Sequence, residues 1–199
     1  MDKYLQKRPS SVQESCQETE KASEETEKLH RANKEVFGND RFRPHQQAII
    51  EAVVLNKDAF VIMPTGGGKS LCYALPAIMS KGITVVISPL LSLIEDQVSS
   101  FIKLPCGGLP CAYLTSTSTV AMTRAVYADL RRGKRGLEPF LKLLYLTPER
   151  VVGSLETRQV LSELYDNEML ARFIIDECHC VSSWGHDFRK VRHKIKELL

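Results

Sequence analysis

The sequence predicts an α/β domain in which helices cover both faces of a doubly wound parallel sheet. Short runs rich in β-branched and apolar residues alternate with stretches of helical periodicity over most of the 199 residues. The runs are apolar almost without interruption, as in Thr84–Ile87, which is typical of strands buried on both faces. A glycine-rich loop joins one run to the next helix. In such sheets ligands bind beyond the carboxyl ends of the strands.

The N-terminal residues are expected to lie outside this domain. Residues 1–27 are polar and rich in Glu and Ser, which predicts a disordered or marginally helical tail. A short helix is expected over Leu29–Phe37 and is ended by Gly38. Pro44 suits the first turn of a second helix that runs to about Leu55.

The domain itself is expected over residues 28–199, with strands and helices in alternation. Strands are expected at Ala59–Met63, Thr84–Ser88, Ala112–Thr115, Lys142–Leu146 and Phe173–Asp176. Helices are expected at Lys69–Met79, Leu90–Lys103, Ser118–Arg132 and Leu155–Leu170.

Composition and charge narrow the class of protein. Hydrophobic residues make up 43% of the chain and charged residues 26%, as in soluble globular proteins. The sequence has no apolar run long enough to span a bilayer and no secretory signal at its N-terminus. We therefore expect no membrane partner and a cytosolic or nuclear location. The net charge of +3 does not by itself indicate nucleic-acid binding. The basic run Arg189–Lys196 either contacts phosphates or forms a solvated helix face.

The six cysteines support neither a zinc site nor a disulfide framework, because no C-x-x-C pair exists. Cys178, His179 and Cys180 are adjacent, but neighbouring residues in a turn point to different sides and no second ligand pair accompanies them. We expect free thiols and no zinc site in this chain.

A phosphate-binding loop is predicted directly after Ala59–Met63. Glycines allow backbone N–H groups to point at phosphate oxygens, and the N-terminus of the next helix adds a positive dipole. Lys69 would reach the β- and γ-phosphates, and the Ser70 hydroxyl would bind Mg²⁺. The strict spacing of such loops would place a glycine at Met63, and the alternative is a glycine-rich turn with an exposed lysine. The predicted nucleotide-binding residues of the loop are Thr65, Gly66, Gly67, Gly68, Lys69 and Ser70.

An acidic pair follows the last predicted strand. The apolar run Phe173–Ile175 ends in Asp176 and Glu177. A carboxylate at a strand tip beside a phosphate loop can hold hydrated Mg²⁺, which is the role expected for Asp176. Glu177 is placed to orient or deprotonate the attacking water. A solvated Asp-Glu turn is the alternative. With Lys69, this pair is expected to be catalytic in ATP hydrolysis.

These motifs together resemble the RecQ family of DNA helicases, which belongs to the DEAH/DExH group of superfamily 2. The phosphate loop and the Asp-Glu-Cys-His sequence at 176–179 resemble motifs I and II. Residues 179–189 resemble the aromatic-rich loop that marks the family. Residues 37–46, 88–97 and 144–150 resemble motifs 0, Ia and Ib, and all of them occur in the family's order.

The resemblance implies a RecA-like P-loop NTPase fold and roles for further residues. Arg43 and Gln46 would read the adenine of ATP. The residues that the resemblance places on single-stranded DNA, or between DNA and hydrolysis, are Ser92, Gln97, Thr147, Arg150, Trp184, Phe188 and Arg189. Exposed rings and a guanidinium suit base stacking and phosphate contact, whereas core packing is the other reading of Trp184 and Phe188. Ser92 and Thr147 equally suit a helix cap and a turn.

The implied function is that of the first motor lobe of an ATP-dependent 3′-to-5′ DNA helicase in recombination and repair. ATP and Mg²⁺ would be its cofactors, single-stranded or forked DNA its partner, and the nucleus its location. A helicase motor closes two lobes over ATP, and the second lobe supplies an arginine finger worth roughly three to five powers of ten in rate. We recognise no second lobe in the sequence, and therefore expect a fragment that binds ATP and does not unwind DNA alone.

Two other readings stay open. The first is a non-catalytic module that binds ATP or single-stranded DNA, and the second is a lobe of a DExH RNA helicase. A P-loop kinase or GTPase is disfavoured, because the sequence has no Asn-Lys-x-Asp guanine-reading motif. After the aromatic-rich loop the family pattern continues Phe-Arg-Pro-x-Tyr, whereas this chain reads Lys190-Val191-Arg192 after Phe188-Arg189, without the Pro and the Tyr.

Overall fold

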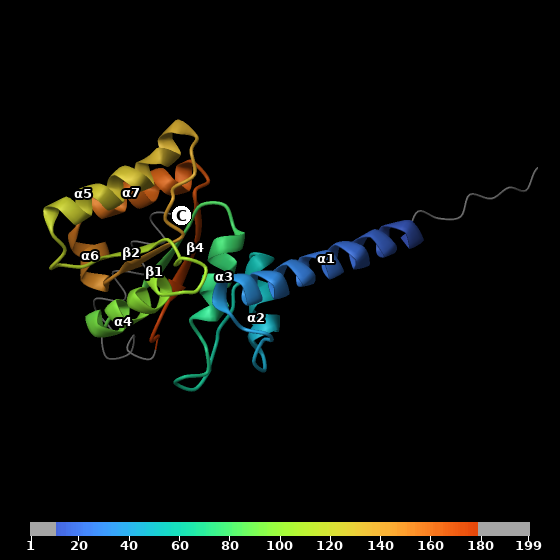
Figure 1. Ribbon diagram of the computed structural model, residues 1–199. Helices are drawn as coiled ribbons and strands as arrows, with labels where there is room; N and C mark the ends of the chain where they lie inside the picture. The colour runs from blue at the N-terminus through green and yellow to red at the C-terminus, as the bar shows by residue number, and fades with distance from the viewer. Residues whose placement is uncertain (1–10, 179–199) are drawn as a thin grey trace, which may run out of the picture.

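A parallel sheet forms the centre of the fold (Figure 1). The computed structural model describes residues 11–178, with side chains from residue 24 onward. Within these residues four strands lie in the order β2-β3-β1-β4, and every neighbouring pair is parallel. The strands are β1 (Ile83–Ile87), β2 (Cys111–Leu114), β3 (Leu143–Leu146) and β4 (Leu170–Ile175). The predicted parallel α/β architecture is confirmed.

The helices alternate with the strands along the chain. They are α1 (Ser11–Phe37), α2 (Gln46–Val54), α3 (Leu71–Met79), α4 (Leu91–Ile102), α5 (Val120–Leu130), α6 (Pro148–Gly153) and α7 (Leu155–Asp166). A 3₁₀ helix, η1 (Arg131–Arg135), follows α5 directly. None of the described helices is long and apolar enough to cross a membrane.

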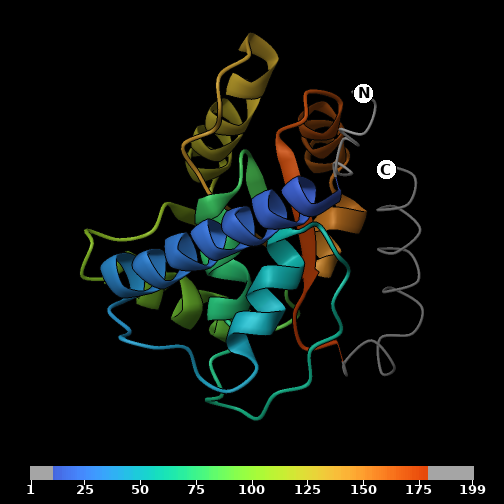
Figure 2. The ribbon, with the colours of Figure 1, turned by 90° about the vertical axis from the view of Figure 1, so that its right-hand side faces the viewer.

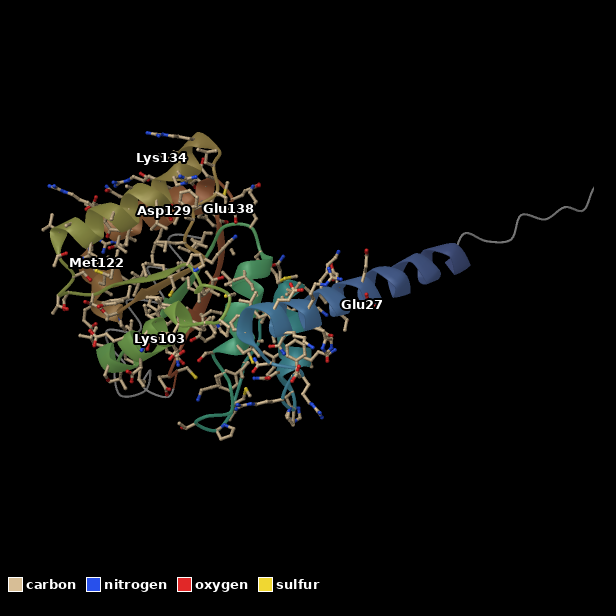
Figure 3. The ribbon with its side chains drawn as sticks, in the orientation of Figure 1. Glu27, Lys103, Met122, Asp129, Lys134 and Glu138 are labelled. Atoms are coloured by element: carbon tan, nitrogen blue, oxygen red, sulfur yellow. The ribbon has the colours of Figure 1, made fainter. Side chains whose placement is uncertain are left out.

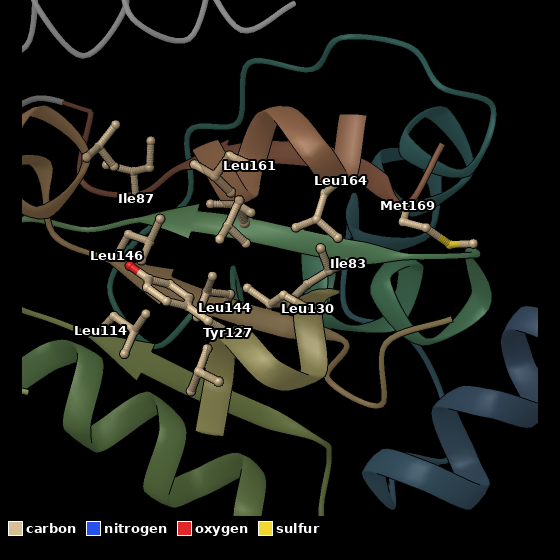
Figure 4. Packing of buried hydrophobic residues seen from close by; sticks show 14 residues of the cluster. Ile83, Ile87, Leu114, Tyr127, Leu130, Leu144, Leu146, Leu161, Leu164 and Met169 are labelled. Carbon is tan, nitrogen blue, oxygen red and sulfur yellow. The ribbon is translucent and has the colours of Figure 1, made fainter. Parts of the chain in front are cut away.

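The two faces of the sheet carry separate hydrophobic clusters, because alternate residues of a strand point to opposite faces. On one face, Leu144 and Leu146 of β3 pack with Leu161 and Leu164 of α7, and Tyr127 of α5 joins them (Figure 4). On the other face, residues of α3 and α4 cover Val86, Leu143 and Tyr145. Helices therefore cover both faces, as the sequence predicts.

Helices α1 and α2 form a further layer on the outer side of α3 (Figure 2). Leu29 of α1 and Ile50 of α2 are buried against Leu71 and Leu75 of α3. The N-terminal end of α1 projects away from the domain (Figure 1). Of the two alternatives for the polar tail, disorder and helix, the structure has helix from Ser11 onward, and this helix continues through the short one expected at Leu29–Phe37.

The prediction of a strand at Ala59–Met63 is wrong. These residues run without regular secondary structure, and the side chains of Phe60 and Ile62 are 79% and 85% exposed. A strand exists only where a neighbour completes its hydrogen-bond ladder. Within the described residues this segment pairs with no strand, and it is absent from the order β2-β3-β1-β4.

Two other boundaries differ from the expectation. Pro44 lies in a turn before α2, and not in its first turn. Helix α7 ends at Asp166, and Leu170 opens β4 where a longer helix was expected. The cause is the left-handed backbone of Glu168 (φ 57°), which ends the helix and turns the chain into the strand.

A charged cluster lies around η1, at the opposite end of the molecule from the glycine-rich loop (Figure 3). Lys134 is 2.6 Å from Glu163, and Arg131 is 3.3 Å from Glu156 and 3.6 Å from Glu163. The guanidinium of Arg132 lies 3.7 Å from the centre of the Phe140 ring. Because these cations already form ion pairs with carboxylates or contact an aromatic ring, we do not assign the cluster to phosphate binding.

Candidate nucleotide-binding site

The glycine-rich loop leads directly into α3. Gly66 and Gly68 have φ values of 75° and 86°, in the left-handed region that glycine adopts without a steric cost. A Cβ atom at Gly68 would lie 2.3 Å from the side-chain nitrogen of Gln46. The loop is therefore a close backbone turn that requires glycine, and its last residue, Ser70, immediately precedes Leu71 of α3.

Two residues from the segment before α2 hold this loop. The Arg43 guanidinium donates a hydrogen bond to the carbonyl of Gly66, and Gln46 Nε2 donates to the carbonyl of Gly68 at 3.0 Å. The Arg43 backbone N–H donates to Gln46 Oε1 at 2.7 Å. The structure thus brings the two predicted adenine-reading residues against the predicted phosphate loop.

A surface depression of about 560 Å³ lies beside the loop. It is lined by Phe42, Arg43, Pro44, His45, Gln47, Ala48 and Glu51. Gln46 is buried and lies outside this lining. His45 has a left-handed backbone (φ 67°), which is uncommon for a residue with a side chain and marks a local constraint where the chain enters α2.

Lys69 and Ser70 lie at the end of the loop. Lys69 Nζ donates to the carbonyl of Met63 at 3.3 Å, so the ammonium lies against the loop backbone. The Ser70 carbonyl accepts from the Ala74 N–H at 2.9 Å, which joins the loop to the first turn of α3. Both side chains are half-buried, so they border the loop without being closed off from solvent.

The acidic pair lies at the carboxyl end of β4. The Asp176 N–H donates to the carbonyl of Ile87 at 2.9 Å, which extends the ladder between β1 and β4 by one bond. The Glu177 N–H donates to Asp176 Oδ1 at 3.0 Å and orients that carboxylate. Glu177 itself has a left-handed backbone (φ 51°). Such a conformation is uncommon in a residue with a side chain, and it turns the chain directly after β4.

Tyr73 connects the loop with the acidic pair. Ile174 of β4 faces the α3 side of the sheet, and alternation along the strand places Asp176 on that same side. Burial raises the pKa of Tyr73 to about 12 and outweighs the hydrogen bond with Tyr145, which lowers this pKa. Tyr73 and Ile174 belong to one hydrophobic cluster, so the helix that follows the loop packs against the strand that precedes the acidic pair.

The residues present fit a nucleotide with Mg²⁺. The loop leads into the N-terminus of α3, whose dipole favours an anion, and at Gly66 no atom lies within 4 Å of the place a Cβ would take. The Ser70 hydroxyl and the Asp176 carboxylate are oxygen donors of the kind that Mg²⁺ prefers. The donor chemistry therefore agrees with the cofactors expected from the sequence.

The expected DNA-contacting residues that the structure describes follow β1 and β3. Ser92 is exposed and Gln97 half-buried on α4. Thr147 is buried and accepts from the Arg150 N–H at 3.4 Å, so it caps α6. Arg150 Nη2 donates to Tyr127 Oη at 3.1 Å. Of the two interpretations of Thr147, DNA contact and structural residue, the structure shows a structural residue that caps α6. The side chain of Arg150 is hydrogen-bonded to Tyr127 in the core.

Several expected positions lie outside the described residues. These are Trp184, Phe188 and Arg189 of the aromatic-rich loop and His179 and Cys180 next to the acidic pair. Sequence reasoning did not single out Tyr73 and Tyr145, which meet beside Ser70. The available signal was a tyrosine hydroxyl in two otherwise apolar stretches, Leu71–Leu75 and Leu143–Leu146.

Comparisons with known proteins bear on the same region. A family model described as DEAD/DEAH box helicase matches residues 43–199. The chain is 50% identical over 153 residues to "RecQ-like DNA helicase BLM" of Xenopus laevis, which is 77% of this chain and 11% of the relative. It is 45% identical over 170 residues to "RecQ-like DNA helicase blm-1" of Caenorhabditis elegans, 85% of this chain and 16% of that protein. It is 47% identical over 158 residues to "ATP-dependent DNA helicase Q5" of Rattus norvegicus, covering 78% and 15%. The chain thus spans less than a fifth of the length of each of these relatives.

Proposed function

Because the chain belongs to the DEAD/DEAH box helicase family, we propose that it is the ATP-binding lobe of a RecQ-like, ATP-dependent 3′-to-5′ DNA helicase. The observation that carries the proposal is the meeting of two motifs at one place. The glycine-rich loop leads directly into α3, and α3 packs in one cluster with Ile174 of β4, which lies two residues before Asp176. DNA recombination and repair in the nucleus is the setting that the relatives' similarity supports.

The loop residues would bind the triphosphate of ATP. Backbone N–H groups of Gly66, Gly68, Lys69 and Ser70 would donate to phosphate oxygens, whereas the Gly67 N–H is bonded to the Pro64 carbonyl. The N-terminus of α3 would add its dipole. Lys69 would exchange its bond to the Met63 carbonyl for the β- and γ-phosphates, since a charged acceptor binds an ammonium more strongly than a carbonyl does. Arg43 and Gln46, which already contact the loop, would orient it and read the base from the same side.

The acidic pair would serve the hydrolysis step. Asp176, held by the Glu177 N–H, would share Mg²⁺ with Ser70, and the cation would neutralise charge that develops on the phosphates. Glu177, one residue further and turned by its left-handed backbone, would orient the attacking water and accept its proton. A second lobe would then supply the arginine that completes such a site.

Single-stranded DNA is the proposed partner of the carboxyl edge of the sheet. Ser92 lies at the start of α4 after β1, and Thr147 and Arg150 lie at the start of α6 after β3, which supports a common position at this edge. Gln97 lies further along α4. Ser92 is exposed there and can reach a phosphate. The proposed contacts of Trp184, Phe188 and Arg189 rest on the sequence resemblance alone.

Lys69→Ala tests nucleotide binding. The variant removes a charge-assisted hydrogen bond to phosphate and should weaken binding of a fluorescent ATP analogue by about ten- to a hundredfold, with the circular dichroism spectrum unchanged. Lys57→Ala is the matched control, because Lys57 is exposed and precedes the loop. Equal binding by Lys69→Ala and the unaltered chain would contradict the proposal.

The alternative function is a module that binds ATP or single-stranded DNA without turnover. Both functions would use the same loop, with Arg43 and Gln46 against it, and they differ only in turnover. Phosphate release, measured with and without single-stranded DNA, separates the two functions. DNA-stimulated release by this chain would exclude the module, whereas binding without release would favour it. Preference for single-stranded RNA in the same assay would favour an RNA helicase lobe.

A further inference from the structure

Arg150 is an arginine without a carboxylate partner at the carboxyl edge of the sheet. It lies in the first turn of α6, directly after the end of β3. Its side chain is half-buried and forms no ion pair with any carboxylate that the structure describes. Its Nε atom is buried and has no hydrogen-bond partner among the same residues. A partly buried cation with an unsatisfied donor costs free energy, which an anion at this position would offset.

Neighbouring arginines on this face of the sheet differ from Arg150 in this respect. Arg131 is 3.3 Å from Glu156. Arg158 Nη1 donates to the carbonyl of Val151 at 3.2 Å, near the end of α6 where the helix dipole is negative. The protein itself thus supplies acceptors for these two guanidinium groups. Arg150 keeps donors for an acceptor from outside the chain.

Two buried hydroxyls hold the Arg150 guanidinium. Arg150 Nη2 donates to Tyr127 Oη at 3.1 Å, and Tyr127 Oη is 2.6 Å from Thr157 Oγ1. Tyr127 and Thr157 are 2% and 1% exposed, and Tyr127 lies among apolar residues (Figure 4). An arginine can only donate, so Tyr127 Oη accepts from it and keeps its own proton for Thr157 Oγ1. This chain of hydrogen bonds connects α6, α5 and α7.

Packing alone does not account for the two hydroxyls. Phenylalanine and valine would fill nearly the same space as Tyr127 and Thr157 without the cost of burying a polar group. What the hydroxyls add is a fixed direction for the Arg150 side chain. An arginine loses much rotational freedom when it binds a ligand, and a side chain that is already held loses less. The guanidinium has five N–H donors, so the bond to Tyr127 leaves others for a ligand.

We infer that Tyr127 and Thr157 are positioning residues that hold Arg150 for a phosphate group of single-stranded DNA. The inference rests on the proposed function and deepens it, because it names two residues that act through Arg150 and do not touch DNA. A phosphate supplies the negative charge that Arg150 lacks, and guanidinium–phosphate hydrogen bonds are charge-assisted. Such a contact is independent of base sequence.

The test is a double-mutant cycle on DNA binding. A fluorescently labelled oligo-dT is titrated with the full chain, and binding is followed by anisotropy at several salt concentrations. Arg150→Ala should weaken binding about tenfold and reduce the slope of log K against log salt concentration by about 0.7, the value for one phosphate contact to a single strand. Tyr127→Phe should weaken binding about three- to tenfold in the unaltered chain and not at all in the Arg150→Ala background.

Control variants separate positioning from a general effect on the fold. Thr157→Val should weaken DNA binding in the same way as Tyr127→Phe, whereas Thr157→Ser keeps the hydroxyl and should restore it. Tyr113→Phe removes a tyrosine hydroxyl from β2, whose side chain packs on the opposite face of the sheet, and should leave DNA binding unchanged. The double variant Tyr127→Phe/Thr157→Val replaces both partners with apolar groups of similar shape, which proteins tolerate well, so it repeats the measurement in a folded protein.

The outcomes distinguish this inference from the proposed function. Unchanged DNA binding by Tyr127→Phe and by the double variant overturns the positioning role and leaves the DNA partner standing. So does a loss of the same size in the Arg150→Ala background, because it indicates an effect that does not pass through Arg150. If Arg150→Ala binds like the unaltered chain, or the unaltered chain binds no oligo-dT, the proposed DNA contact fails and the positioning role fails with it.

Discussion

At the scale of single residues, the candidate site depends on the absence of a side chain at Gly68. Gly68 has no Cβ, and the Gln46 amide occupies the space where one would lie. The Lys69 side chain bonds to the loop carbonyl of Met63 and the Arg43 side chain to that of Gly66. Side chains thus hold the loop through its carbonyl oxygens. The Gly67 N–H donates to the Pro64 carbonyl at 3.0 Å, so the other N–H groups of the loop are the candidates for phosphate binding.

Gly68→Ala should disturb this arrangement in two ways. The added Cβ displaces the Gln46 side chain, and the left-handed backbone (φ 86°) is strained for alanine. We expect a loss of about 1–2 kcal/mol in the free energy of unfolding, measured in urea, together with weaker binding of the ATP analogue. Gly153→Ala is the control, since no atom lies within 4 Å of a Cβ there and the change should be neutral or slightly stabilising. Equal stability of the two variants would contradict this view of the loop.

The tyrosine pair shows what sequence reasoning misses at the residue scale. Lys69, Ser70, Asp176 and Glu177 were predictable, because their chemistry and spacing form a local pattern. The bond between Tyr73 and Tyr145 joins positions from a helix and a strand, and no local spacing encodes it. The same holds for the bond from Gln46 to Gly68, because the sequence suggests the residue but not its contact with the loop.

At the scale of elements, capping residues begin the helices that follow the sheet. Thr119 accepts from the Met122 N–H, Thr147 from the Arg150 N–H and Ser154 from the Thr157 N–H. Each bond satisfies one of the free N–H groups in the first turn of a helix. Thr147 thereby has a structural task at a position where the resemblance implies a DNA contact.

Alanine substitutions at two caps measure this task. Ser154→Ala and Thr147→Ala should each lower the free energy of unfolding by about 0.5–2 kcal/mol. The bond at Ser154 is 3.1 Å and that at Thr147 is 3.4 Å, so Ser154→Ala is expected to cost more. Thr147→Ser keeps the hydroxyl and should recover most of the loss. Urea titration gives the three values, and a neutral Thr147→Ala would indicate that this residue is not a cap in solution.

Element positions were largely predictable, and the clearest exception is the strand expected at Ala59–Met63. The strands expected at Thr84–Ser88 and Lys142–Leu146 appear within one residue at each end, because their continuous apolar pattern matches burial on both faces. Ala59–Met63 has the same pattern, but a strand also needs a partner, and the described residues give it none. The apolar pattern of a segment indicates that its side chains can be buried, but it does not indicate which strand, if any, pairs with the segment.

At the scale of the whole molecule, stability and site geometry share one outer layer. Helix α1 covers α2 and α3, and its Leu29, which is 2% exposed, packs in the cluster with Ile50 and Leu75 (Figure 2). Helix α2 begins at Gln46, which holds the loop, and α3 begins directly after that loop. Helix α1 therefore supports the start of α2 and the start of α3, which are the two parts of the fold that hold the glycine-rich loop.

Leu29→Ala should accordingly lower the free energy of unfolding by about 2–5 kcal/mol, since it leaves a cavity in this cluster. That is a large share of the roughly 5–15 kcal/mol that stabilises a typical domain. Leu55→Ala is the control, because Leu55 at the end of α2 is 57% exposed. Thermal unfolding measures both, and equal midpoints would show that α1 does not stabilise the domain.

The exposure of Phe60 and Ile62 has a consequence for how the molecule behaves in a crowded solution. Five consecutive apolar residues, Ala59–Met63, carry no charge and include two β-branched side chains and one ring, the composition of segments that nucleate cross-β aggregates. Lys57 and Asp58 before them and Pro64 after them act as gatekeepers that oppose such stacking. The resistance of this chain to aggregation therefore depends on the balance between the aggregation-prone segment Ala59–Met63 and the three residues that flank it.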